Sequence, residues 1–309
     1  MATLAPPSET GLLTRPEGLQ TPLRRPAART GAVWVRRFVT RKPLGAIGAG
    51  IVLLLLFVAL FAPVLSPYEY DVGVGADRLQ GPSWTHPFGT DANGRDMFSR
   101  IVWGARVSIT VGFGAVGLSA LLAVTIGVLS AYLGGWFDLL VQRLVDIWIS
   151  FPAVVLLISL IAVIGPGLWS VTFVLGILLA PGTSRVIRGA VIGVRHLPYM
   201  EAARCLGAGH GRIIARHILP NVFAPVIVLS TVQLGAAILA ESTLSFLGYG
   251  IPPPFPAWGA MLSGTGRAFM LQSPWLSIWP GLAISAAVFG FNMLGDALRD
   301  ELDPRLRGR

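Results

Sequence analysis

The sequence predicts an all-α membrane protein, and three features of its 309 residues support this class. Hydrophobic residues make up 53% of the chain and charged residues 13%, whereas a soluble domain carries about 25% charged residues. Several uninterrupted apolar stretches approach the roughly 20 residues that a helix needs to cross a bilayer. Ten-residue segments of alternating apolar and polar positions, which form membrane β-barrels, are absent. We therefore expect a polytopic helical protein.

The chain divides into an N-terminal arm, a membrane domain and a short tail. Residues 1–43 are rich in Pro, Arg, Ala and Thr without an apolar period, so we expect a disordered or loosely ordered arm. Residues 44–298 form the membrane domain and residues 299–309 the tail. Six apolar stretches predict six transmembrane helices: 45–65, 107–131, 139–164, 168–184, 221–242 and 275–294.

The distribution of basic residues predicts the orientation of these helices. The arm carries eight Lys and Arg against two acids, and the loop 185–220 carries six Arg against one acid. The segment 66–106 has four Arg against five acids. Because cytoplasmic loops are enriched in Lys and Arg, the arm and the loop 185–220 are expected in the cytoplasm. Six crossings then place both termini there.

The same distribution bears on the partners of the chain. A basic stripe beside exposed aromatic residues would indicate nucleic-acid binding, but here the net charge of +9 is explained by the alternating loops, so we expect membrane lipid and no nucleic acid as a partner. The single cysteine, Cys205, excludes an intrachain disulfide and a cysteine metal cluster.

The cytoplasmic loop contains a short stretch with clear helix signals. Pro198 suits the first position of a helix, and Glu201 in the first turn favours the helix dipole. Gly207 is placed to end this helix with a left-handed cap. A second helix is expected after the sequence GAGHG, running through Pro220 into the fifth span. From the pattern alone, the loop could lie on anionic headgroups or dock to a cytoplasmic partner.

The spacing within this loop resembles a known motif. Glu-Ala-Ala, three residues, Gly207, nine residues, and then His217 followed by Ile-Leu-Pro is similar to the EAA motif of the membrane subunits of ABC importers. The general motif has a hydrophobic residue where this chain has His217, and His-x-Leu-Pro-Asn resembles the peptide and nickel branch. The segments 86–108, 132–152, 237–262 and 294–307 resemble the second permease subunit of dipeptide and oligopeptide importers, in order and spacing.

This resemblance implies a type I ABC importer transmembrane domain in a prokaryotic cytoplasmic membrane. It implies a homologous second permease subunit, two ATP-binding subunits or domains that hold ATP and Mg, and an extracytoplasmic substrate-binding protein. The chain itself would need no cofactor and perform no catalysis. The residues that would couple it to an ATPase are Pro198, Tyr199, Met200, Glu201, Ala202, Ala203, Arg204, Gly207, His217 and Pro220.

The resemblance implies a dipeptide or oligopeptide as the substrate, with nickel or glutathione as the alternative. An ATP-independent secondary transporter is the rival class, but inverted repeats and intramembrane charges that would mark it are not evident. A membrane enzyme would need a nucleophile, a base and an orienting group, and no such set is present.

A few charged residues outside the loop are further candidates. Arg143 and Asp146, three residues apart on a helix, favour an interfacial ion pair over a role in gating. Glu241 lies near the outer end of the fifth span, where it either marks the interface, pairs with Arg267, or faces the translocation path as a candidate site for a peptide amino group.

The external segment holds a second group of candidates. Asp91, Arg95 and Asp96 occur in the sequence GTDANGRD, which predicts a structured turn and a candidate docking point for the binding protein. His86 with these acids lacks the spacing of a zinc site or a Ser-His-Asp triad. The glycines of GFGAVG (112–117) lie inside a span, so we expect close helix packing there rather than a dinucleotide site.

Overall fold

The computed structural model describes residues 39, 40 and 42–302, and these residues are helical apart from loops and one isolated bridge between Thr90 and Asp96. The helices are α2 (Pro43–Leu60), α3 (Ala62–Leu65), η1 (Gly75–Asp77), α4 (Met97–Leu133), α5 (Gly135–Ser150), α6 (Ala153–Ile164), α7 (Leu168–Arg195), α8 (Pro198–Cys205), α9 (His210–Ile213), the π-helical turn η2 (Ile214–Ile218), α10 (Leu219–Phe246), α11 (Trp258–Leu262), α12 (Thr265–Ala268) and α13 (Trp275–Leu302).

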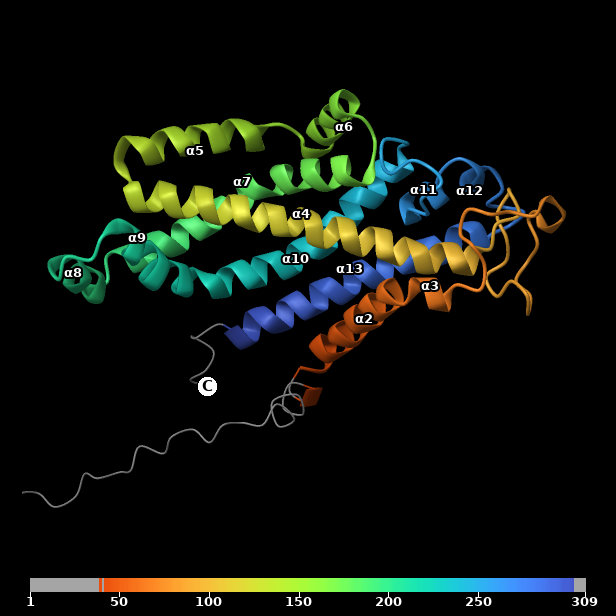
Figure 1. Cartoon of the computed structure of the whole chain (residues 1–309), viewed down its shortest axis with the longest axis horizontal. Coiled ribbons are helices and arrows are strands. Elements are labelled where there is room, and N and C mark those ends of the chain that lie inside the picture. Colours follow the sequence, from red (N-terminus) through yellow and green to blue (C-terminus); the bar gives the residue numbers. More distant parts are fainter. Residues whose placement is uncertain (1–38, 41, 303–309) are drawn as a thin grey trace, which may run out of the picture.

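Among the described residues, five helices are long and apolar enough to cross a membrane. They are α2, α4, α7, the continuous segment His210–Phe246, and α13; the bent pair of α5 and α6 makes a sixth span if it counts as one. Figure 1 shows the long helices side by side, with α8 and α9 at one end of the molecule and α11 and α12 at the other. This arrangement confirms the all-α membrane fold.

The third span differs from the expected single helix over residues 139–164. α5 ends at Ser150, α6 begins at Ala153, and the two helices are bent by 91° at the break. Phe151 is extended and Pro152 is the N-cap of α6. A proline disfavours the helical conformation of the residue before it, so the chain leaves α5 there and starts a new helix.

Four of the other spans extend beyond their predicted ends, whereas the first, predicted over 45–65, is divided at Phe61 into α2 and α3. α4 begins at Met97 instead of residue 107, and α7 continues to Arg195 instead of ending at residue 184. α13 continues to Leu302 instead of residue 294. Hydropathy marks only the part of a helix that matches hydrocarbon, whereas caps and side-chain contacts decide where the helix ends. The segment read as the loop 185–220 therefore begins with more than two turns of α7.

Close contact between α4 and α7 forms the centre of the bundle. A Cβ added at Gly127 of α4 would lie 2.6 Å from the backbone oxygen of Ser184, and one added at Gly176 of α7 would lie 2.7 Å from Leu118. Small residues let membrane helices approach this closely, so that backbone packs on side chain. Within GFGAVG, Gly112 faces Ile238 of α10 and fits the expected packing role.

The first and last spans bring their ends together. Lys42 Nζ lies 2.5 Å from Asp300 Oδ2, joining the start of α2 to the last turns of α13. The start of α2 and the end of α13 therefore lie on the same side of the bundle, as an even number of crossings requires. Their cytoplasmic orientation stays a prediction, and most of the arm 1–43 and of the tail 299–309 lies outside the described residues.

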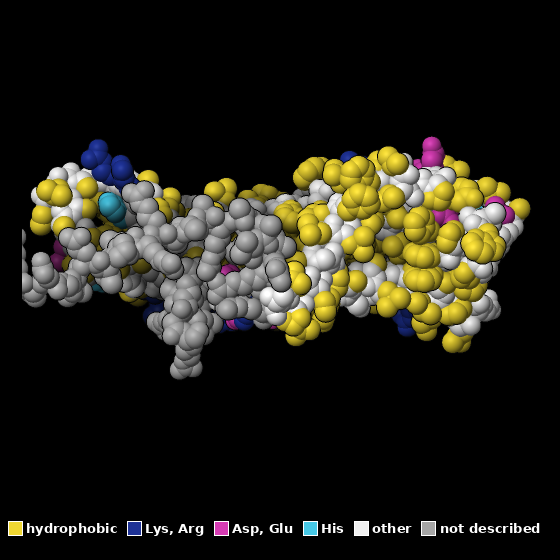
Figure 2. Space-filling model, turned by 90° about the horizontal axis from the view of Figure 1, so that it is seen from below, with side chains coloured by type: hydrophobic (Ala, Val, Ile, Leu, Met, Phe, Trp, Pro, Cys, Tyr) yellow, Lys and Arg dark blue, Asp and Glu magenta, His cyan; other side chains and the backbone are white. Residues whose placement is uncertain are grey.

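Basic side chains gather at one end of the molecule. Figure 2 shows Lys, Arg and His at the end that carries α8 and α9, and mostly apolar side chains with a few acidic and basic ones towards the opposite end. Large apolar side chains are also exposed along the spans, such as Leu53 of α2 and Leu121 of α4, as expected for helices that face hydrocarbon. The basic end is the one that the positive-inside rule assigns to the cytoplasm.

Candidate functional site

The short helix α8 has the start and the end that its sequence predicts. Pro198 occupies the first turn after the extended Leu197, and Glu201 is the acidic residue of that turn. At the other end, Gly207 has a φ of 78°, its N–H donates to the Arg204 carbonyl, and the Ala208 N–H donates to the Ala203 carbonyl. These two bonds form a Schellman cap, which satisfies carbonyl groups that would otherwise lack partners.

The second half of the motif lies in a π-helical turn. α9 begins at His210, within the GAGHG sequence, and leads through Ile214–Ile218 directly into α10. His217 lies in this turn, with its ring 6.1 Å from the ring of Tyr199. Asn221 Nδ2 donates to the His217 carbonyl at 2.6 Å and to the Tyr199 hydroxyl at 3.3 Å. These contacts fix α8 to the start of α10, and π turns recur at functional sites.

One buried side chain anchors α8 to the membrane helices. Met200 is fully buried, and it is the only buried residue among the eight of α8. It belongs to a cluster contributed by α4, α7, α9, the π turn and α10: Ala123, Val128, Ala131, Ile187, Val191, Ile213, Ile218 and Val222. α8 thus contacts the ends of three spans through a single hydrophobic attachment.

The opposite face of α8 is exposed. Glu201, Ala202, Arg204 and Cys205 are exposed, and Leu206, which follows the helix, is 88% exposed. A leucine this exposed at the water-facing end of a membrane protein suits contact with another protein. α8 therefore presents a small surface with an apolar tip, on a helix fixed from behind by Met200.

Two arginines of α7 hold the turn between α4 and α5. The Arg188 guanidinium donates to both oxygens of Asp138, from Nε at 2.7 Å and from Nη2 at 2.5 Å, and Ser130 also donates to this carboxylate. Arg195 Nη1 donates to the Ala131 carbonyl at 2.6 Å. Bidentate pairing of arginine with a carboxylate fixes geometry as well as charge. The sequence reasoning did not find the Asp138–Arg188 pair, because its partners are 50 residues apart.

A second ion pair lies along the same helix contact. Asp146 pairs with Arg143 at 3.6 Å, as expected from their spacing, and it also pairs with Arg185 of α7. The order of the pairs, 138 with 188 and 146 with 185, matches antiparallel helices. Asp138, Asp146, Arg185 and Arg188 therefore form a row of charged contacts between α5 and α7, and α7 is the helix that leads into α8.

The residues predicted to dock the binding protein, Asp91, Arg95 and Asp96, make hydrogen bonds within their own segment, residues 66–106. Asp96 is 2% exposed; one of its oxygens accepts from the Ser99 N–H at 2.7 Å and caps α4, and the other lies 2.9 Å from His86 Nδ1. Asp91 accepts from the N–H of Arg95 at 2.9 Å and so closes the predicted turn. Docking of the binding protein at these residues stays a prediction, and the burial of Asp96 gives it a structural part in shaping that surface. No group of three metal-ligating side chains occurs in the described part of the chain.

Glu241 is fully buried near the C-terminal end of α10. Its carboxyl group accepts from the Ser245 hydroxyl at 2.7 Å and from the Ser242 hydroxyl at 3.3 Å, and within the described residues it has no ion pair. Gly259 of α11 packs on the Ser242 carbonyl so closely that an added Cβ would lie 1.9 Å away. Glu241 thus sits where α10 meets α11, and its place on the translocation path stays a prediction.

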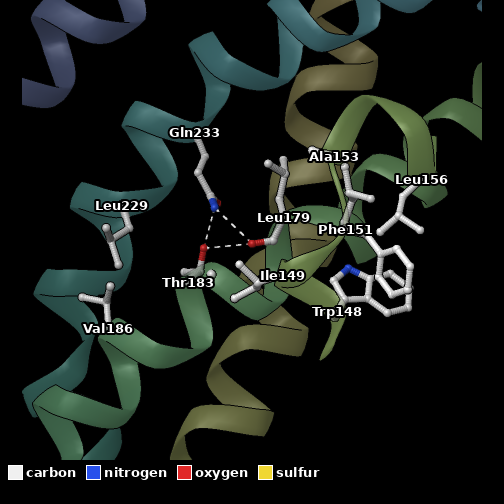
Figure 3. A pocket seen from close by; sticks show the side chains of 12 residues that line it. Trp148, Ile149, Phe151, Ala153, Leu156, Leu179, Thr183, Val186, Leu229 and Gln233 are labelled. Carbon is white, nitrogen blue, oxygen red and sulfur yellow. Dashed lines mark hydrogen bonds between the residues drawn. The ribbon is translucent and has the colours of Figure 1, made fainter. Parts of the chain in front are cut away.

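A cavity of about 360 Å³ lies where the α5–α6 break meets α7 and α10 (Figure 3). Its lining is mostly apolar, with polar groups from Gln233, Thr183 and Trp148: Trp148, Ile149, Phe151, Ala153, Leu156, Leu178, Leu179, Gly182, Thr183, Val186, Leu229 and Gln233. The sequence reasoning missed this site. Gln233 and Thr183, two polar residues inside apolar spans, were the signal that could have indicated it.

Comparison with known proteins gives two family matches. Residues 123–308, more than half of the chain, match the binding-protein-dependent transport system inner membrane component family. Residues 31–82 match the N-terminal transmembrane domain of oligopeptide transport permease C. The first match includes the candidate coupling loop and every residue that lines the cavity.

Individual relatives extend over most of the chain. A dipeptide transport system permease protein of Alkalihalophilus pseudofirmus is 43% identical over 267 residues, which are 86% of this chain and 88% of that protein. A glutathione transport system permease protein of Pectobacterium atrosepticum is 40% identical over 88% of this chain and 90% of its own length. One from Escherichia coli is 38% identical over 96% and 95%. The chain therefore belongs to the family of binding-protein-dependent transport system inner membrane components, the multi-pass permeases of ABC importers.

Proposed function

We propose that this chain is one of two permease subunits of an ATP-driven importer for short peptides. It forms half of the translocation pathway, together with a homologous second permease. Its relatives include permeases named for dipeptide and for glutathione, itself a tripeptide, and this supports a short peptide as the substrate. An extracytoplasmic binding protein delivers the peptide to the end of the bundle that carries α11 and α12.

The coupling loop is the part of the chain that is moved when the ATPases bind and hydrolyse ATP. ATP and Mg are bound by two partner ATPase subunits or domains, each of which contacts one permease. The exposed face of α8, together with Leu206, forms the contact with an ATPase. The single observation that carries this assignment is the construction of α8, which is exposed on one face and attached through Met200 on the other.

The contacts behind α8 give the motion a route into the membrane. α8 follows α7 after two residues, and Tyr199 bonds to Asn221 at the start of α10. A displacement of α8 therefore moves α7 and α10 together, and Arg188 carries the turn of α5 with them. Rigid-body movement of helix bundles is the expected form of alternating access. The chain performs no covalent step in this cycle.

The exposed Cys205 allows a direct test of the docking surface, because it is the single cysteine of the chain. The complete complex, with cysteine-free partners carrying one cysteine in the ATPase groove, is treated with a short bis-maleimide in lipid nanodiscs. We expect a cross-link between Cys205 and the ATPase, with a yield that changes when ATP is added. A matched control replaces Cys205 with serine and introduces Leu271→Cys, 93% exposed at the opposite end of the molecule, which should give no cross-link.

Transport separates the proposed function from its rival. Leu206→Asp should abolish ATP-driven peptide uptake while leaving the folded permease intact, because this side chain contacts little within the chain. Peptide uptake that persists without ATP, together with the absence of the Cys205 cross-link, would instead indicate a secondary transporter.

A further inference from the structure

The cavity of Figure 3 lies near the middle of α7 and α10, where the break between α5 and α6 meets them. Gln233 lies fourteen residues after the start of α10 and thirteen before its end, and Thr183 lies near the middle of α7. The 91° break of the third span, at Phe151 and Pro152, lies at the same level. Since a transported molecule must be reachable from either side in turn, a site on its path belongs near the middle of the membrane.

The polar groups of the cavity are held in place by bonds between helices. Gln233 Nε2 of α10 donates to Thr183 Oγ1 and to the Leu179 carbonyl of α7, the latter at 3.5 Å, and Thr183 Oγ1 donates to the same carbonyl at 3.2 Å. Among the residues that the structure describes, the remaining oxygen, Gln233 Oε1, accepts only from the Ser119 hydroxyl of α4, at 3.5 Å. Both amide hydrogens of Gln233 are thus committed, while its oxygen keeps capacity to accept another bond.

The cavity also contains a donor without a partner. The indole N–H of Trp148 is buried and makes no hydrogen bond among the described residues. In Figure 3 the indole nitrogen lies at the edge of the ring turned toward Thr183 and Gln233. A buried donor at membrane depth is costly unless something bonds to it, so Trp148 points to a ligand that brings an acceptor.

We propose that this cavity is a subsite of the translocation path that binds one peptide unit and its side chain. The unpaired Trp148 N–H donates to a peptide carbonyl, and Gln233 Oε1 accepts from a peptide N–H. The apolar walls, with Phe151, Leu156 and Leu229, surround an uncharged side chain. This inference rests on the proposed function, because it assumes that peptides cross this permease.

The chemistry of the lining favours a peptide over a lipid acyl chain. An acyl chain needs only apolar walls, so it would leave the Trp148 N–H without a partner and would not use the remaining acceptor capacity of Gln233 Oε1. A peptide group presents one acceptor for the unpaired Trp148 N–H and one donor for the remaining acceptor capacity of Gln233 Oε1. Binding sites of this kind pair an apolar lining with a few polar groups that set orientation.

Trp148→Phe provides the cleanest test, since it removes the N–H and keeps an aromatic ring. In proteoliposomes with the complete complex and its binding protein, we expect the KM for dipeptide uptake to rise about threefold to tenfold, the range for loss of one hydrogen bond. The matched control is Trp279→Phe, which removes a second buried indole N–H that has no partner among the described residues, on a ring stacked on Phe88 and outside the cavity. Its KM should stay unchanged.

A photo-crosslinking residue in place of Val186, which lines the cavity, identifies the occupant. We expect it to capture a labelled dipeptide during ATP-driven uptake, whereas the same residue in place of Phe173, exposed elsewhere on α7, should capture only lipid. The subsite proposal is wrong if the wild type takes up dipeptide normally, Trp148→Phe leaves the KM unchanged, and position 186 gives lipid adducts alone. These results would leave the proposed function unaffected. Absence of ATP-driven dipeptide uptake by the wild type would instead contradict the proposed function.

Discussion

Replacement of Met200 by alanine tests whether α8 acts through its single hydrophobic attachment. Met200 is fully buried, and the other seven residues of α8 are not. Truncation of a buried methionine to alanine costs about 2–5 kcal/mol. Here that loss falls on the attachment of one short helix, so the detached fraction of α8 should rise by about 30-fold to several thousand-fold, at tenfold for each 1.4 kcal/mol.

The consequence is a loss of coupling, because the ATPase contact surface is on the exposed face and stays intact. We expect Met200→Ala complexes to hydrolyse ATP while importing much less peptide per ATP than the wild type. Hydrogen exchange should show faster exchange of the α8 amides with little change in the middle of α4 and α7.

Met200→Leu serves as the control, since a hydrophobic swap of similar volume costs less than about 1.5 kcal/mol and should keep most of the coupling. If Met200→Ala imports peptide with the wild-type ratio of peptide to ATP while its α8 amides exchange faster, then α8 does not transmit motion through this attachment.

Two further substitutions test contacts that hold the bundle. Asp138→Asn should weaken the contact between α5 and α7 by about 1–2 kcal/mol, a value between those for exposed and buried ion pairs. A double-mutant cycle with Arg188→Gln, measured by thermal unfolding, should give a coupling energy of that size. Additive effects of the two substitutions would contradict a direct bond. Gly259→Ala should abolish accumulation of folded protein, because its Cβ would lie 1.9 Å from the Ser242 carbonyl, whereas Gly281→Ala, with nothing within 4 Å, should accumulate normally, as measured by fluorescence-detected size exclusion.

The spans show how far hydropathy alone carries a prediction. It located every long helix but misplaced ends by up to eleven residues, as at Arg195 of α7. Asp96, interpreted from sequence as a surface residue, is the cap that starts α4. An N-cap is recognisable only when the helix start is known, and the apolar run that signals α4 begins well after its first turn.

Glu241 shows the limit for single charged residues. Its position in the chain indicated depth in the membrane, but not direction. The structure buries it against serines of its own helix and against α11. The direction in which Glu241 points depends on the packing of α10 against α11. The polar residues of α10 do not recur with a helical period, so the sequence does not indicate which face of α10 is packed.

The sequence by itself determined the membrane class, the order of the spans, and the start and end of α8. These features depend on local physics, namely the transfer of apolar residues into hydrocarbon, the missing N–H of Pro198 and the left-handed backbone at Gly207. The tertiary structure alone decided the angle at the α5–α6 break, the pairing of Asp138 with Arg188 and the cavity beside Gln233. The ion pair and the cavity join residues distant in sequence, so they exist only once the helices have packed, and the size of the angle depends on how α5 and α6 pack on their neighbours.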